Sequence, residues 1–132
     1  MAMVRTSQED MAGLLQRYEQ ACSDLKGGHL QEAKAQFQYL ASKVPLEPRF
    51  YFGLGLTLQQ LGHMEQALRQ FTICVHLDPA DAAATYRLGE SLQMLGETDD
   101  ARAMLNDALK LCGLPETDPQ LRALVEARLQ TL

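Results

Sequence analysis

Residues 48–79 read PRFYFGLGLTLQQLGHMEQALRQFTICVHLDP, and this stretch decides the fold. Apolar residues in its first half recur at steps of three and four, the period of an amphipathic helix; they are Tyr51, Leu54, Leu58 and Leu61. The second half has the same spacing in Met64, Ala67, Phe71 and Cys74. Gly62 divides the halves, because glycine readily adopts the left-handed conformation that ends a helix. Pro79 stops the second helix. The stretch therefore predicts a helical hairpin.

The same hairpin recurs before and after this stretch at one constant offset. Four columns of residues share this register: Gly28, Gly62 and Gly96; Ala33, Ala67 and Ala101; Phe37, Phe71 and Leu105; and Ala21, Gly55 and Gly89. A helix–turn–helix unit with a period of about 34 residues is the signature of the tetratricopeptide repeat, and the spacing of these columns matches it. The chain resembles that family over about residues 14–115.

We therefore expect an all-α fold, in which one tetratricopeptide-repeat domain spans residues 1–132. The expected superhelix has three helical hairpins and a C-terminal capping helix, seven helices in all. The repeats are predicted at about 14–47, 48–81 and 82–115, and the capping helix at about 118–131. The capping helix is expected to cover the open end of the array, as repeat proteins require.

Several helix starts are predicted from capping residues. Ser7 is a candidate N-cap for the first helix, with Asp10 three residues on. Pro48 suits a first helical turn. Further candidate N-caps are Asp81, Thr98 or Asp99, and Thr117 or Asp118.

Composition narrows the class of protein. The 132 residues are 46% hydrophobic, contain no Trp and carry a formal net charge of −5, which argues against nucleic acid or an anionic membrane as the main partner. The apolar runs are far shorter than a membrane span, and no signal-peptide pattern is present, so we expect no membrane anchoring and a location in the cytoplasm. Three cysteines in helical patterns, Cys22, Cys74 and Cys112, are expected to be reduced.

Groups that could support catalysis are few. His29 and His63 occupy the same repeat position after the turn glycines, so the repeat explains them better than chemistry does. His76 follows Cys74 by two residues, a spacing that points the two side chains in different directions on a helix. No phosphate loop, paired-cysteine metal motif or nucleophile elbow occurs in the sequence. We expect no catalytic residue, no metal site, no cofactor and no enzyme activity.

The resemblance to tetratricopeptide proteins implies a binding surface. In that family the first helices of the hairpins line the concave face of the superhelix, called the groove here, and the fifth residue of each repeat points into it. These positions hold Tyr18, Phe52 and Tyr86, which are aromatic in all three copies. The alternative is that the three rings pack between repeats as core; we favour the groove because Tyr suits a surface that is apolar on one side and wet on the other. Further groove candidates are Arg49, Leu56, Gln59, Gln60, Ala83, Glu90, Gln93 and Met94.

The same lining excludes one class of ligand. Tetratricopeptide domains that bind the acidic tails of heat-shock chaperones use Lys, Arg and Asn in the groove. The corresponding positions here hold Tyr18, Cys22, Phe52, Leu56, Tyr86 and Glu90. We therefore expect an extended or partly helical protein segment with apolar anchors as the ligand.

A narrower resemblance is found in the middle repeat. Its EPRFYFGLGLTLQQLGHMEQALRQF is similar to the bacterial type III secretion chaperones that hold translocator proteins, which have an arginine–aromatic stretch followed by G-L-G, matched here by residues 49–55. The resemblance implies a cytoplasmic bacterial chaperone that keeps a secreted translocator soluble and hands it to a type III secretion system, a virulence function. Members usually have a longer N-terminal region involved in dimerisation, whereas this chain has little before Ser7. We expect a weak homodimer that becomes a monomer when the client protein is bound.

Two alternatives remain open from the sequence. One is a chaperone of another secretion client, such as a needle subunit whose amphipathic helix lies in the same groove. The other is a general tetratricopeptide adaptor with no chaperone role. The sequence does not name the client.

Overall fold

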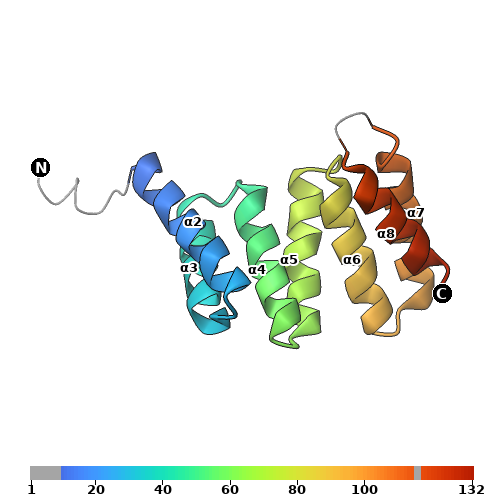
Figure 1. The fold of residues 1–132 in the computed structure, drawn as a ribbon, viewed down its shortest axis with the longest axis horizontal. Coiled ribbons are helices and arrows are strands. Elements are labelled where there is room, and N and C mark those ends of the chain that lie inside the picture. Colours follow the sequence, from blue (N-terminus) through green and yellow to red (C-terminus); the bar gives the residue numbers. More distant parts are fainter. Residues whose placement is uncertain (1–9, 115–116) are drawn as a thin grey trace, which may run out of the picture.

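The computed structural model describes residues 10–114 and 117–132. Within these ranges the chain forms seven α-helices and no strand, which confirms the all-α prediction. The helices, shown in Figure 1, are α2 (Met11–Lys26), α3 (Leu30–Lys43), α4 (Pro48–Gln60), α5 (Met64–Leu77), α6 (Ala82–Met94), α7 (Thr98–Leu111) and α8 (Pro119–Leu129).

The first helices of the hairpins, and α8, begin at side-chain caps. Asp81 accepts a hydrogen bond from the backbone N–H of Ala84, and Asp118 accepts one from Gln120, as predicted. Pro48 occupies the first turn of α4, also as predicted. The prediction for α2 is wrong, because Asp10 is itself the N-cap and accepts from Gly13 at 2.8 Å; Ser7 lies outside the described residues.

The second helices begin differently. Thr98 is already the first residue of α7, and the N-cap is Glu97, whose side chain makes no capping bond, so the prediction of Thr98 or Asp99 as cap is wrong. The preceding turn explains this start. Gly96 has φ of +84°, and the N–H of Glu97 bonds back to the carbonyl of Leu92 at 2.9 Å, which ends α6 and leaves one residue before α7. Gly28 and Gly62 have φ of +81° and +82° and confirm the predicted turns.

Glycines on the first helices admit aromatic rings from the second helices. A Cβ atom placed on Gly55 would lie 2.5 Å from a ring carbon of Phe71, and one on Gly53 would lie 2.3 Å from Phe37. Both rings are fully buried. The G-L-G stretch therefore fixes two contacts, since Phe71 belongs to the same hairpin and Phe37 to the preceding one.

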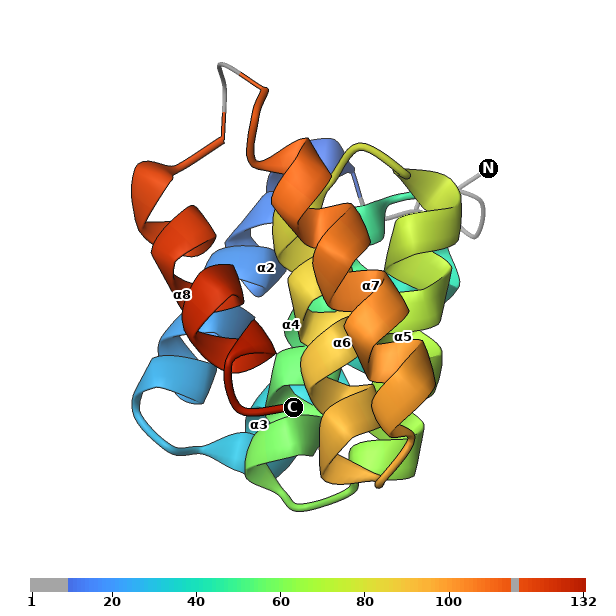
Figure 2. The same ribbon diagram turned by 90° about the vertical axis from the view of Figure 1, so that its right-hand side faces the viewer.

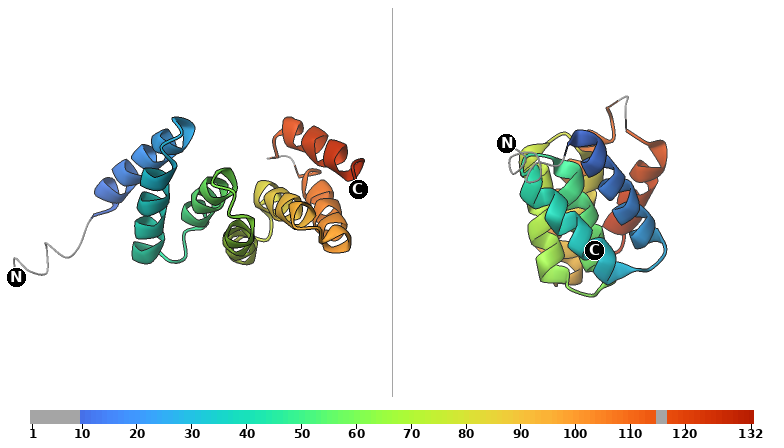
Figure 3. Two further views of the ribbon diagram at one scale, coloured as in Figure 1. Left: turned by 90° about the horizontal axis from the view of Figure 1, so that it is seen from below. Right: turned by 90° about the vertical axis from the view of Figure 1, so that its left-hand side faces the viewer.

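The seven helices stack side by side into an elongated array, with the N-terminal side at one end and α7 and α8 at the other (Figure 1). Seen end-on, α2 and α8 lie on one side of the molecule and α5 and α7 on the other, with α4 and α6 between them (Figure 2). Seen from below, the array bends into an arc, and α2 and α8 stand at its two ends on the same side (Figure 3). Among the described residues, no helix combines the length and apolar composition needed to cross a membrane.

Candidate functional site

An apolar pocket, called the main pocket here, lies between the first two repeats, where α2, α3 and α4 meet. Its volume is about 440 Å³. Mostly apolar residues from α2, α3, α4 and the turn between α2 and α3 line it: Tyr18, Cys22, Leu25, Lys26, Gly28, Phe37, Phe52, Gly53, Leu56 and Gln60. A concave site with an apolar lining and few polar groups is the usual form of a binding site.

An edge pocket of about 200 Å³ adjoins the main pocket, because Tyr18 and Phe52 line both. Its remaining lining is more polar and consists of Pro48, Arg49, Asp78, Asp81 and Ala83. The guanidinium of Arg49 lies 5.4 Å from the centre of the Tyr18 ring and pairs with Glu47 at 2.9 Å. The two rings therefore separate an apolar pocket from a charged one.

Tyr18 and Phe52 are each half-buried and held by neighbouring rings. The Tyr18 ring is 6.1 Å from Phe37 and 5.6 Å from Phe50, and the Phe52 ring is 5.7 Å from Phe71. Burial, followed by the neighbouring Cys22 thiol, raises the pKa of the Tyr18 hydroxyl, which therefore stays protonated at neutral pH. Both rings pack in the core on one side and face a pocket on the other. Groove lining and core packing, the two alternatives for the aromatic positions, are therefore combined at Tyr18 and Phe52.

The third aromatic position differs from the first two. Tyr86 is only 5% exposed and packs with Leu105, Ala108 and Val125, the last from α8. Arg128, also on α8, donates a hydrogen bond to the Tyr86 hydroxyl at 3.3 Å. Of the three aromatic positions, Tyr18 and Phe52 are therefore open to a pocket, whereas Tyr86 is covered by α8.

The other predicted groove residues separate in the same way. Arg49, Leu56 and Gln60 line the pockets beside Tyr18 and Phe52, and so does Ala83. Glu90 and Gln93 both bond to Arg128 of α8, and Gln59 donates to Glu90 at 3.0 Å. Met94 is 61% exposed.

Five residues of the main pocket escaped the sequence-based list of groove candidates: Leu25, Lys26, Gly28, Phe37 and Gly53. Leu25 and Lys26 occupy the repeat positions that Gln59 and Gln60 hold in the next repeat, so the register already carried the signal for them. Phe37 lies on a second helix and reaches the pocket because Gly53 has no side chain.

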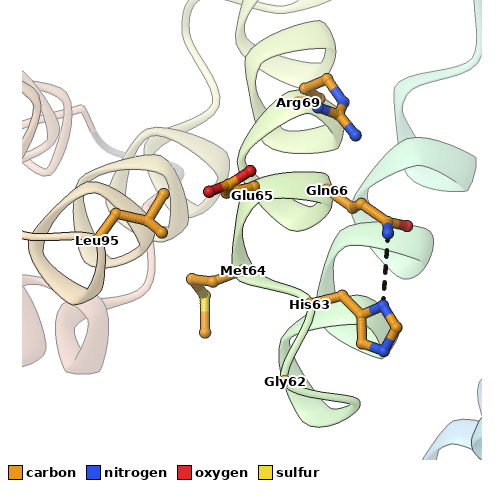
Figure 4. Close-up of a pocket in the computed structure, with 7 residues that line it drawn as sticks. All are labelled: Gly62, His63, Met64, Glu65, Gln66, Arg69 and Leu95. Atoms are coloured by element: carbon orange, nitrogen blue, oxygen red, sulfur yellow. Dashed lines mark hydrogen bonds between the residues drawn. The ribbon is translucent and has the colours of Figure 1, made fainter.

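A third cavity, of about 510 Å³, lies at the turn between α4 and α5 and is shown in Figure 4. Its lining includes Gly62, His63, Glu65, Arg69 and Leu95. The His63 ring is engaged by the Gln66 side-chain amide at 3.4 Å, and Glu65 points away from it (Figure 4). The described residues also contain no group of three or more His, Cys, Asp or Glu side chains that is placed to hold a metal ion. This cavity thus offers no acid–base pair.

The tetratricopeptide repeat model matches the sequence over residues 18–67 and 54–114, which together span most of the chain. The chain belongs to the tetratricopeptide repeat family. No curated protein sequence matches it. The family assignment agrees with the register of the aligned columns and with the observed hairpins.

Solved structures resemble this tetratricopeptide chain over nearly its whole length. The type III secretion translocator chaperone SycD from Yersinia enterocolitica has a TM-score of 0.89 at 22% identity, covering 98% of this chain and 89% of that one. A type III secretion complex from Aeromonas hydrophila has a TM-score of 0.88 at 27% identity, covering 98% and 85%. PcrH, known from Pseudomonas aeruginosa, was solved with the chaperone-binding region of PopD; it has a TM-score of 0.89 at 25% identity, covering 93% and 92%.

Proposed function

We propose that this protein is a bacterial cytoplasmic chaperone that binds a secreted translocator in its groove, keeps it soluble and hands it to a type III secretion system. The observation that carries the proposal is the main pocket, an apolar cavity in a fold similar to that of PcrH, which was solved with the chaperone-binding region of PopD. An extended client segment with spaced apolar side chains fits such a site.

The charges around the pockets support an apolar client over an acidic tail. Among the described residues that line the main pocket, Lys26 is the one cation. Arg49 in the edge pocket is already paired with Glu47 and stands beside Asp78 and Asp81. An acidic peptide would therefore meet carboxylates at this edge, where like charges oppose binding.

The proposal includes no enzyme activity. Tetratricopeptide repeats form a scaffold, on which chemistry requires specific residues brought together. Among the described residues that line its pocket, the Cys22 thiol has no histidine beside it to act as a base.

Co-expression tests this function. A candidate translocator, a secreted protein with hydrophobic segments encoded near this chain, is produced alone and together with the chain. We expect it to be insoluble alone and to co-purify as a soluble complex with the chain. A translocator that is equally soluble alone, or that stays insoluble with the chain present, would refute chaperoning.

The same preparation separates the alternatives. Mass spectrometry of proteins captured from the native organism identifies the client, so capture of a needle subunit in place of a translocator would reassign the chaperone. Capture of several unrelated soluble proteins would favour a general adaptor. A matched pair of variants controls both experiments: Phe52→Ala alters the pockets, and Arg102→Gln changes an exposed residue of α7.

A further inference from the structure

Arg128 on α8 is held by three acceptors on α6. Its Nε donates to the Tyr86 hydroxyl at 3.3 Å, its Nη1 donates to Gln93 Oε1 at 3.0 Å, and its Nη2 pairs with Glu90 Oε2 at 2.9 Å. The guanidinium carbon also lies 5.9 Å from the centre of the Tyr86 ring. Each guanidinium nitrogen therefore has its own acceptor, an arrangement that suits the planar fork of arginine and not the compact ammonium of lysine.

Glu90, the charged acceptor, is held in place without help from α8. Glu90 is 9% exposed, and its other oxygen, Oε1, accepts hydrogen bonds from Arg87 Nη1 and Gln59 Nε2, each at 3.0 Å. Gln59 also donates to the Ser91 hydroxyl at 3.1 Å. The carboxylate therefore keeps its place through residues of α4 and α6, and Oε2 remains directed toward the guanidinium.

The position of this site in the repeat register connects it with the pockets. Tyr86 and Glu90 of the third repeat align with Phe52 and Leu56 of the second and with Tyr18 and Cys22 of the first. The four residues of the first two repeats line the main pocket. Corresponding positions of the third repeat are thus filled by a side chain of the protein's own last helix.

The apolar attachment of α8 to the array consists of the fully buried Val125 and the partly buried Leu121 and Leu129. Val125 is its one buried residue, whereas Leu124 is 51% exposed. Gln93 further donates to the Thr131 hydroxyl just beyond the helix, at 2.8 Å. The hydrogen bonds and the ion pair that Arg128 and Thr131 make with residues of α6 therefore provide much of the polar contact between the C-terminal end of the chain and the array.

We propose that Tyr86, Glu90 and Gln93 form a guanidinium-binding subsite of the groove, which Arg128 fills in the free chain and an arginine of the client fills in the complex. The client part rests on the proposed function, and the subsite itself does not. The exchange keeps Glu90 paired at all times, so neither state leaves a buried carboxylate oxygen without a donor. A client arginine placed beyond the apolar anchors would then contribute to specificity.

The subsite is tested first without a client, in the full-length Arg128→Ala variant. Side-chain amide signals of Gln59 and Gln93 are followed by NMR during titration with methylguanidinium and, separately, methylammonium. We expect saturable shifts with methylguanidinium and at least tenfold weaker binding of methylammonium. The matched control is Arg122→Ala, since Arg122 pairs with Glu126 on the exposed side of α8 at 3.0 Å; with Arg128 in place it should show no saturable shift. Equal responses to both cations, or none to methylguanidinium, would overturn the subsite.

The client is tested next, with a synthetic peptide of the translocator segment that the complex protects from proteolysis. We expect Arg128→Ala to raise the affinity of the chain for this peptide by three- to tenfold and Arg122→Ala to leave that affinity unchanged. Replacing the peptide's arginine by glutamine should weaken binding to the wild-type chain by about tenfold. A bound segment that contains no arginine, or unchanged affinity for Arg128→Ala, would overturn the exchange. If no translocator segment binds at all, the proposed function fails, and the methylguanidinium titration still decides the subsite.

Discussion

Replacing Gly53 by alanine tests how the G-L-G stretch holds the stack together. The added Cβ would lie 2.3, 2.4 and 2.8 Å from three ring carbons of Phe37, whereas carbon atoms in contact prefer about 3.5–4.0 Å. By that comparison the ring must move by roughly 1 Å. Phe37 is fully buried and has the Tyr18 ring 6.1 Å away, and the open space beside it is the main pocket, which it lines.

Two opposing effects set the size of the result. Alanine is favoured over glycine in a helix interior by about 1 kcal/mol. Overpacking a rigid core typically costs about 1–3 kcal/mol. Because the clash is with a fully buried aromatic ring, we expect the upper part of that range and a net loss of about 1–2 kcal/mol in the free energy of unfolding.

Urea unfolding followed by circular dichroism measures this change. A second variant, Phe37→Leu, supplies the control, since a smaller side chain makes room for the new methyl group. Gly53→Ala should cost at least about 1 kcal/mol less in the Phe37→Leu background than in the wild type, a coupling that a double-mutant cycle isolates. If Gly53→Ala is neutral or stabilising in the wild type, helix propensity outweighs the contact and the reasoning is refuted.

Four further predictions concern the groove, the core, the thiols and assembly. Phe52→Ala should weaken client binding by about tenfold or more with the fold intact, as calorimetry and thermal melting will show, because interface energy concentrates in a few buried aromatics; an exposed-site Arg102→Gln variant should change neither. Ala67→Leu should lower the free energy of unfolding by roughly 1–3 kcal/mol, since Ala67 is fully buried, and unchanged thermal stability would refute the predicted helix contact. Burial, with a smaller effect of Asp81, raises the pKa of Cys74 to about 12, so iodoacetamide at pH 8 should leave this thiol unmodified and should label Cys22 in the main pocket. Bound client should slow the labelling of Cys22, and equal labelling of Cys74 and Cys22 would contradict this prediction. Sedimentation over the micromolar range should reveal a weak homodimer, and a strictly monomeric free chain would contradict that expectation.

The sign of the Cys74 effect on stability follows from the same shift. Its pKa is higher in the folded chain than in the unfolded chain, so the folded state binds more protons between about pH 9 and pH 12. The contribution of the protonated Cys74 thiol to the free energy of unfolding is therefore fully present below about pH 9, and it is lost as the pH rises toward 12. The hydrogen bond from the Cys74 thiol to the carbonyl of Pro48, at 3.4 Å, requires the same protonated form.

The sequence predicted those parts of the fold that the repeat states more than once. The aligned glycines Gly28, Gly62 and Gly96 indicated three turns at which the chain reverses, and all three glycines adopt positive φ. Glycine at position 55 and phenylalanine at position 71 align with Gly89 and Leu105, and both pairs are in close contact in the structure. Each set of aligned residues indicates the same contact in several repeats, so a chance match in one repeat has little influence on the prediction.

Helix starts were predicted less accurately, because a short turn leaves several capping residues within reach. Thr98 and Asp99 are good N-caps by residue type, yet the backbone bond from Glu97 to Leu92 fixes where α7 begins. Backbone closure at Gly96 thus outweighed the side-chain preference, and sequence alone does not reveal which of the two prevails.

The environment of Tyr86 could not be predicted from the repeat register, and the reason is the end of the array. After Tyr18 and after Phe52 the chain continues into another hairpin, whose first helix packs next in the array. After Tyr86 no further hairpin follows, and α8 takes that place. Arg128 reaches Tyr86 from that helix, and its counterpart one repeat earlier is Met94, which is exposed and gives no hint of the contact. The register therefore predicts an open groove position at Tyr86, whereas the last helix closes it. A groove inferred from repeats should accordingly be read as open only as far as the last repeat that the terminal helix does not touch.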